Sequence, residues 1–265
     1  MPRPQVRFVT LTGADDTVAP GSLLGLSREY PFAEFGILAS GRAFSLFASS
    51  HRFPSWEWLR QLQASAARYA QHNPAQPFNL SLHLCGEWVR SLLLGRVVFP
   101  TEILNGFQRV QLNFHAEKSD YDADAFRDAL AVFGDRELIF QIDGGDGAAL
   151  MESTMIDGGP NHVPLFDLSG GAGIVPNEWP RPEYVAPRHP DDSGPDRAIL
   201  HGFAGGLGPG NIVAELGRIF DACERSQLDV PAIWIDMETK LRNDADRFDF
   251  AACRTVLCAV KPFTV

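Results

Sequence analysis

The stretches FDLSGGAG at residues 166–173 and AGGLGPGN at residues 204–211 decide which fold the sequence predicts. Each is an apolar run that ends in small residues and leads toward a segment able to form a helix. A strand that stops on glycines and continues into a helix leaves backbone N–H groups facing an anion. Two such turns in succession predict a β/α barrel that holds a phosphate or a carboxylate near its last strands.

Strand-like runs recur along the whole chain and alternate with helix-like segments. There are eight such runs: residues 7–11, 35–39, 79–84, 109–114, 138–142, 164–168, 198–204 and 232–237. Strands separated by helical crossovers pair in parallel, and the simplest closed arrangement of eight is a (β/α)8 barrel. The sequence therefore predicts the α/β class and a single-domain TIM barrel over residues 1–265.

Apolar residues at helical spacing mark several of the connections. They predict helices at residues 56–69, 122–133, 211–223 and 248–260. Ser55 is the expected N-cap of the first of these, and the proline-rich residues 177–195 predict a loop. An open doubly wound sheet is the alternative fold. It requires a glycine fingerprint after the first strand, and TGADD at residues 12–16 matches that fingerprint poorly.

The composition is that of a globular protein with a sizeable core. The 265 residues are 45% hydrophobic and 21% charged, and the net charge is −10. Because nucleic-acid backbones require clustered Lys and Arg, this acidic balance argues against a nucleic-acid partner. No apolar stretch reaches the ~18 residues that span a bilayer, and the first residues lack a signal-peptide pattern. The four cysteines lack zinc-ligand spacing, so reduced thiols and a cytoplasmic location are expected.

The order of the motifs resembles that of phosphoribosylanthranilate isomerase, the barrel enzyme of tryptophan biosynthesis. Residues 166–173 are similar to the family's Leu-Leu-Asp-Ser and Gly-Gly-Thr-Gly segments, with Trp179 beyond them. Residues 203–212 are similar to its Leu-Ala-Gly-Gly-Leu-Asn-Pro-Glu-Asn-Val segment. Weaker echoes are VQLN at 110–113 and SHRF at 50–53. The resemblance implies a divergent isomerase that performs an Amadori rearrangement on a phosphorylated aminosugar or a related small phosphorylated acid.

The chain departs from the family pattern at two places. Thr12 stands where the family has a cysteine that acts as the general base, and a hydroxyl has no useful basicity near neutral pH. In the last strand, IDMETKLR at 235–242 stands where the family reads Val-Asp-Val-Ser-Ser-Gly-Val-Glu. Glu238 thus brings a negative charge toward the expected phosphate, and Lys240 replaces a glycine. Activity on phosphoribosylanthranilate itself is therefore expected to be absent or very weak.

Side chains at the carboxyl ends of the strands form the active site of a barrel. Asp167 is the candidate acid, and Asp143 or His83 is the candidate base in place of the missing thiol. Arg52 is a candidate for binding a substrate carboxylate. An aspartate that caps a turn and a solvated loop arginine are the alternatives for Asp167 and Arg52. The candidate anion-binding residues are Ser169, Gly171, Gly173, Gly205, Gly206, Asp236 and Glu238.

Other kinds of barrel protein remain open alternatives. A metal-dependent enzyme would use His83, His115, Asp143 and Asp167 as ligands. No compact ligand motif supports this set, so neither a metal nor a cofactor is predicted. A lysine-dependent enzyme would form a Schiff base at Lys240. A non-catalytic relative would bind a small phosphorylated or anionic ligand without an acid–base pair beside it.

Overall fold

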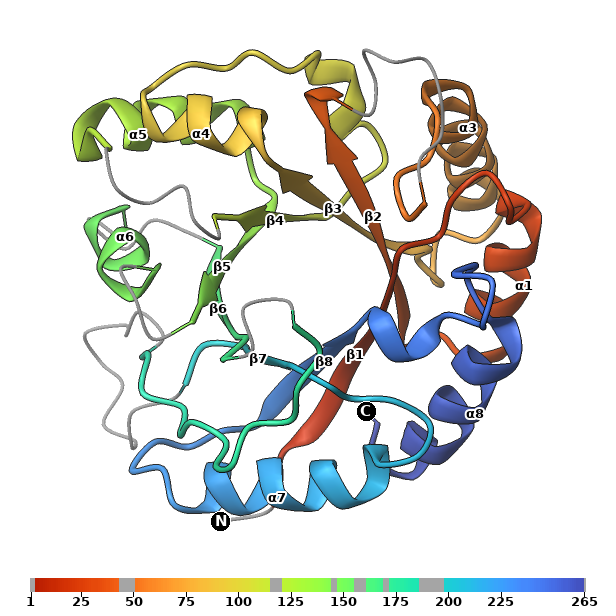
Figure 1. The fold of residues 1–265 in the computed structure, drawn as a ribbon, viewed down its shortest axis with the longest axis vertical. Coiled ribbons are helices and arrows are strands. Elements are labelled where there is room, and N and C mark those ends of the chain that lie inside the picture. Colours follow the sequence, from red (N-terminus) through yellow and green to blue (C-terminus); the bar gives the residue numbers. More distant parts are fainter. Residues whose placement is uncertain are drawn as a thin grey trace.

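The computed structural model describes residues 3–42, 51–114, 121–143, 147–154, 161–168, 172–185 and 198–264. Its strands close into a barrel in the order β1 to β8, and neighbouring strands are parallel (Figure 1). The strands are β1 (Gln5–Thr12), β2 (Ala33–Ser40), β3 (Asn79–Cys85), β4 (Arg109–Asn113), β5 (Glu137–Ile142), β6 (His162–Phe166), β7 (His201–Ala204) and β8 (Ala232–Met237). The predicted TIM barrel is confirmed. The open-sheet alternative is wrong, because β1 pairs with β8.

Helices surround the barrel (Figure 1). They are α1 (Pro20–Glu29), α3 (Trp56–His72), α4 (Glu87–Leu93), α5 (Ala123–Leu130), α6 (Gly147–Thr154), α7 (Ile212–Glu224) and α8 (Phe250–Val260). Short 3-10 helices are η1 (Thr101–Leu104), η3 (Ala131–Phe133), η4 (Thr239–Leu241) and η5 (Lys261–Phe263). Among the described residues, none of the helices is long and apolar enough to cross a membrane.

The four predicted helices correspond to α3, α5, α7 and α8, and Ser55 accepts a hydrogen bond from the N–H of Trp58 as the expected N-cap of α3. Sequence reasoning missed α1, α4 and α6. Glycines at positions 21 and 25 lower the helix propensity of α1. α4 and α6 have only 7 and 8 residues, too few for a clear helical period. Residues 177–185 form neither helix nor named strand, which agrees with the predicted loop; 186–195 lie outside the described residues.

Alternation along the strands separates two apolar layers. One large cluster joins the outward faces of the strands to the helices. A smaller cluster of Ile139, Val163, Leu165, Ala204 and Trp234 fills the barrel interior. Above and below this cluster, the side chains that point into the barrel are mostly polar.

A cluster of charges occupies the interior near the amino ends of the strands. Arg109 is 3% exposed, and its guanidinium donates to Glu34 at 2.8 Å and to Glu137 at 2.5 Å. The same guanidinium lies 4.3 Å from the centre of the Trp234 ring. We call Arg109, Glu34 and Glu137 the lower cluster. It lies at the end of the barrel opposite to the carboxyl ends of the strands, where the candidate site is expected.

Candidate active site

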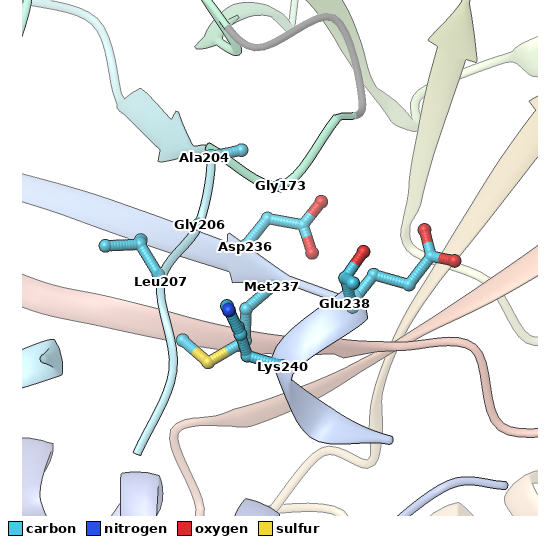
Figure 2. Close-up of a pocket in the computed structure, with 10 residues that line it drawn as sticks. Gly173, Ala204, Gly206, Leu207, Asp236, Met237, Glu238 and Lys240 are labelled. Atoms are coloured by element: carbon cyan, nitrogen blue, oxygen red, sulfur yellow. The ribbon is translucent and has the colours of Figure 1, made fainter. Parts of the chain in front are cut away.

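A small cavity lies where β6, β7 and β8 end (Figure 2). Its volume is about 60 Å³, several times the roughly 10–15 Å³ that one water needs. Its lining comes from three segments of the chain: Gly173, residues 204–207 and residues 236–240. The cavity thus brings together residues of both glycine-rich turns and the end of the last strand, and the anion-binding role of these residues stays a prediction.

Gly206 allows two of these segments to lie in close contact. Its φ is +62°, and a Cβ there would lie 2.6 Å from the Val175 nitrogen and 2.8 Å from the Gly173 oxygen. Any side chain would therefore force the turn after β6 away from the turn after β7. Asn211, just before α7, fixes the second turn. Its Oδ1 accepts from the Gly208 N–H, and its Nδ2 donates to the Gly206 carbonyl, both at 2.9 Å.

The two charged residues that depart from the family pattern have separate surroundings. Lys240 packs against Gly208, where a Cβ would lie only 2.4 Å from the Lys240 Cβ, and Lys240 lines the cavity. Glu238 accepts a hydrogen bond from Arg52 at 2.8 Å. In Figure 2 the Glu238 carboxylate points away from Gly206 and Lys240. The negative charge expected beside the phosphate is therefore paired with a guanidinium.

Arg52 lies at the rim of the barrel mouth in a left-handed backbone conformation, with φ of +77°. Its backbone N–H donates to Asp15 at 3.1 Å, and its guanidinium donates to Glu238 and, at 3.3 Å, to Asp246. A substrate carboxylate that binds Arg52 has to compete with these two carboxylates. The carboxylate-binding role of Arg52 stays a prediction.

Asp236 and Thr12 form a buried pair on neighbouring strands. The Thr12 hydroxyl donates to Asp236 Oδ1 at 2.7 Å. Burial, with the charges of Glu238, Glu34 and Asp167, raises the pKa of Asp236 to about 7, although the Thr12 hydrogen bond lowers it. A fraction of the Asp236 carboxyl is therefore protonated near neutral pH. Sequence reasoning included Asp236 as a binding residue but missed this, since the shift depends on burial and since three of the four groups, Thr12, Glu34 and Asp167, are remote in the chain.

His83 borders the same pair from β3. A Cβ on Gly36 would lie 2.2 Å from the Thr12 hydroxyl and 2.8 Å from His83 Nε2, so both atoms flank one small space. Burial, together with the charge of Arg109, lowers the pKa of His83 to about 3. His83 is therefore a neutral imidazole and a weak base. Cys85, two residues on, is a protonated thiol, because burial raises its pKa to about 12.

Asp143 and Asp167 follow two paired strands. Ile142 and Phe166 are register partners, and the Asp167 N–H donates to the Ile142 carbonyl at 3.1 Å. The two aspartates are thus the next residues on adjacent strands, at the same height in the barrel. Asp167 is 6% exposed, and its charge acts on Asp236 across the mouth.

Three residues of the predicted site lie outside the described residues, namely Ser169, Gly171 and His115. The turn-capping alternative for Asp167 involves the first two and stays open. Within the parts of the chain that the structure describes, no group of three or more His, Cys, Asp or Glu side chains has the arrangement of a metal site.

Fold and cavity together define a TIM barrel with a small cavity between the turns that follow its last three strands. Solved structures of phosphoribosylanthranilate isomerases have a similar fold. The TrpF protein of Jonesia denitrificans is 13% identical, with a TM-score of 0.54 over 97% of this chain and 98% of that one. The isomerase of Thermus thermophilus is also 13% identical, with a TM-score of 0.53 over 96% and 98%.

A third structure is a phosphoribosylanthranilate isomerase in complex with reduced 1-(O-carboxyphenylamino)-1-deoxyribulose 5-phosphate. It is 13% identical, with a TM-score of 0.51 over 96% of this chain and 98% of that one. A scan of protein-family models and a search of curated proteins find no match. The predicted resemblance is thus confirmed for the fold, over nearly the whole chain.

Proposed function

We propose that this chain is a barrel isomerase that acts on a phosphorylated small molecule, whose phosphate binds in the cavity at the ends of β6, β7 and β8. The observation that carries the proposal is the lining of that cavity. It combines glycines of two glycine-rich turns, the second of them fixed by Asn211, with the ammonium-bearing Lys240. Backbone N–H groups of glycine-rich turns and a lysine are a common combination for phosphate. One of the similar structures holds a 5-phosphate compound.

The proposed reaction is an Amadori rearrangement of a phosphorylated aminosugar. It needs a proton on the ring oxygen as the bond from the anomeric carbon to that oxygen breaks, and then removal of the proton on the adjacent carbon. The electron pair of that C–H bond forms the new double bond to the anomeric carbon, and the nitrogen loses its positive charge. Asp167 donates the first proton.

Asp143 is the base of the proposed reaction. A hydroxyl at position 12 is a poor proton acceptor, and His83, with its low pKa, is a weak one. Asp143 stands beside Asp167 on the adjacent strand end and is half-buried. Two carboxyl groups on neighbouring strands can hold opposite protonation states, as one acid and one base require.

Asp167→Asn tests the acid. The variant keeps the shape of the side chain and removes its proton. We expect kcat to fall by ~10²–10⁴-fold while KM changes little. The assay follows ketose formation from phosphoribosylanthranilate and other phosphorylated N-glycosides. Asp128→Asn, an exposed aspartate on α5, is the matched control and should keep full activity. Gly206→Asp should raise KM, because any side chain there forces the turns after β6 and β7 apart and a carboxylate also repels the phosphate.

Two results would contradict the proposal. Equal activity on substrates with and without the phosphate would show that the cavity does not bind the substrate phosphate. Phosphate binding without turnover of any N-glycoside in the series would instead identify a ligand-binding relative. The replacement of the family cysteine by Thr12 is the observation that favours this second candidate.

A further inference from the structure

The charges that line the cavity leave one cation and one carboxyl to meet an anion. The ionisable side chains of the lining are Asp236, Glu238 and Lys240. Glu238 is paired with Arg52 and points away from the cavity centre (Figure 2). Asp236 Oδ1 accepts from Thr12, and among the described residues no hydrogen bond reaches Oδ2, so Oδ2 can meet a bound group. In so small a cavity, any anion next to Lys240 also lies close to the Asp236 carboxyl.

An anion and the Asp236 carboxylate in one small cavity repel each other unless a proton lies between them. The groups that act on Asp236 from the surrounding elements are the Thr12 hydroxyl on β1, Glu34 on β2, Asp167 after β6 and Glu238 after β8. Three of these four are carboxylic acids, so this environment favours a proton on Asp236. A phosphate monoester has its second pKa near ~6, so it too can carry the proton.

We propose that the cavity binds a phosphate-type anion together with one proton, which is held between the anion and the Asp236 carboxyl. This rests on the phosphate-binding role proposed above and adds the charge state that the site selects. Hydrogen phosphate carries its own proton and donates it to the ionised carboxylate. Sulfate has no proton to donate, and a phosphate monoester has lost its own above neutral pH. These two must bind together with a proton taken from solvent.

Calorimetry of the full-length protein with sulfate and with inorganic phosphate tests the proposal. Burial already raises the pKa of free Asp236 to about 7. Sulfate affinity should therefore fall about tenfold per pH unit between about pH 7.5 and pH 9, with about one proton taken up per sulfate. Two buffers of different ionisation enthalpy count that proton. Phosphate affinity should change less than about threefold over the same range.

Three variants separate the groups involved. Asp236→Asn keeps the shape and should make sulfate binding independent of pH, without proton uptake. Thr12→Val removes the hydrogen bond that lowers the Asp236 pKa, so the fall in sulfate affinity should begin at a higher pH. Lys240→Met is the matched control. It should weaken both anions and leave the pH slope unchanged.

The outcomes keep the two proposals distinct. Sulfate and phosphate binding that is equally independent of pH, without proton uptake, would overturn the proton-sharing site and leave the proposed phosphate site intact. An unchanged slope in Asp236→Asn would assign the proton to another group and would also overturn it. Failure of the wild-type protein to bind either anion would overturn both proposals together.

Discussion

The two ends of this barrel bury ionisable groups in opposite ways. In the lower cluster, the guanidinium of Arg109 lies between Glu34 and Glu137, so each carboxylate has a cationic partner. At the upper end, where the carboxyl ends of the strands lie, Asp236 is buried. Its partner is a hydroxyl, and other carboxyls surround it. Within the described residues, no ion pair involves Asp236. At the lower end a shared cation opposes the rise that burial causes in the pKa of Glu34, whereas the upper end holds a carboxyl whose proton is exchangeable near neutral pH.

The difference follows from what each end does in a barrel. Charge pairing at the amino ends stabilises the barrel, because catalytic groups gather at the carboxyl ends. Removing one partner of a buried ion pair leaves the other charge buried without a counter-ion. A buried carboxyl without a cation instead shifts its pKa, which is how enzymes tune acids and bases. The contrast makes predictions for each end.

The largest effect is expected for Arg109→Met. The change leaves the buried Glu34 and the partly exposed Glu137 without their cation, so the free energy of unfolding at pH 7 should fall by about 3–5 kcal/mol. Urea denaturation followed by circular dichroism measures it. Adding Glu34→Gln to this variant should recover part of the lost free energy of unfolding, because it removes the buried, unpaired carboxylate of Glu34. A fall below about 1 kcal/mol for the single variant would mean that the lower cluster does not stabilise the fold.

Asp236→Asn should have the opposite sign. The pKa of this carboxyl is about 7 in the folded chain and ~3.9 when unfolded. Its contribution to stability is thus fully present below about pH 3.9 and is lost as the pH rises through about 7. At about pH 8 the Asn variant should be more stable than the wild type by on the order of 2 kcal/mol, and this difference should shrink toward about pH 5. Parallel pH curves for both proteins would contradict the raised pKa.

The smallest change in stability is expected at the rim, for Arg52→Gln. The Arg52 side chain is 34% exposed, so losing its ion pairs should cost less than about 1 kcal/mol. Sulfate affinity should nevertheless fall about two- to fivefold at low salt, because the unpaired Glu238 adds a negative charge near the cavity. Calorimetric titration of the wild type and the Arg52→Gln variant with sulfate measures this change in affinity. Glu238→Gln in the same chain should restore the affinity, and a double variant that binds as weakly as the single one would refute the account.

The sequence by itself determined the barrel and indicated which glycine-rich turns meet beside one small cavity. Both depend on local patterns: alternation within strands, helical spacing between them, and glycines at turns such as Gly206, where a Cβ has no room. The small residues at 173 and 205–206 could therefore be predicted to line one site. The fold was reached even though α1, α4 and α6 were missed, since eight strands in order define the closed sheet.

Only the tertiary structure decided the charge state of the site. The Thr12–Asp236 hydrogen bond joins residues 224 positions apart, and the Arg52–Glu238 pair joins residues 186 apart. No local pattern links such residues, and a pKa depends on every charge and every buried surface near the group. The same holds for Arg109, whose place among strand residues gave no sign of two carboxylate partners. A chain fixes its strands and turns through neighbours in sequence, whereas electrostatics inside the barrel depends on distance in space.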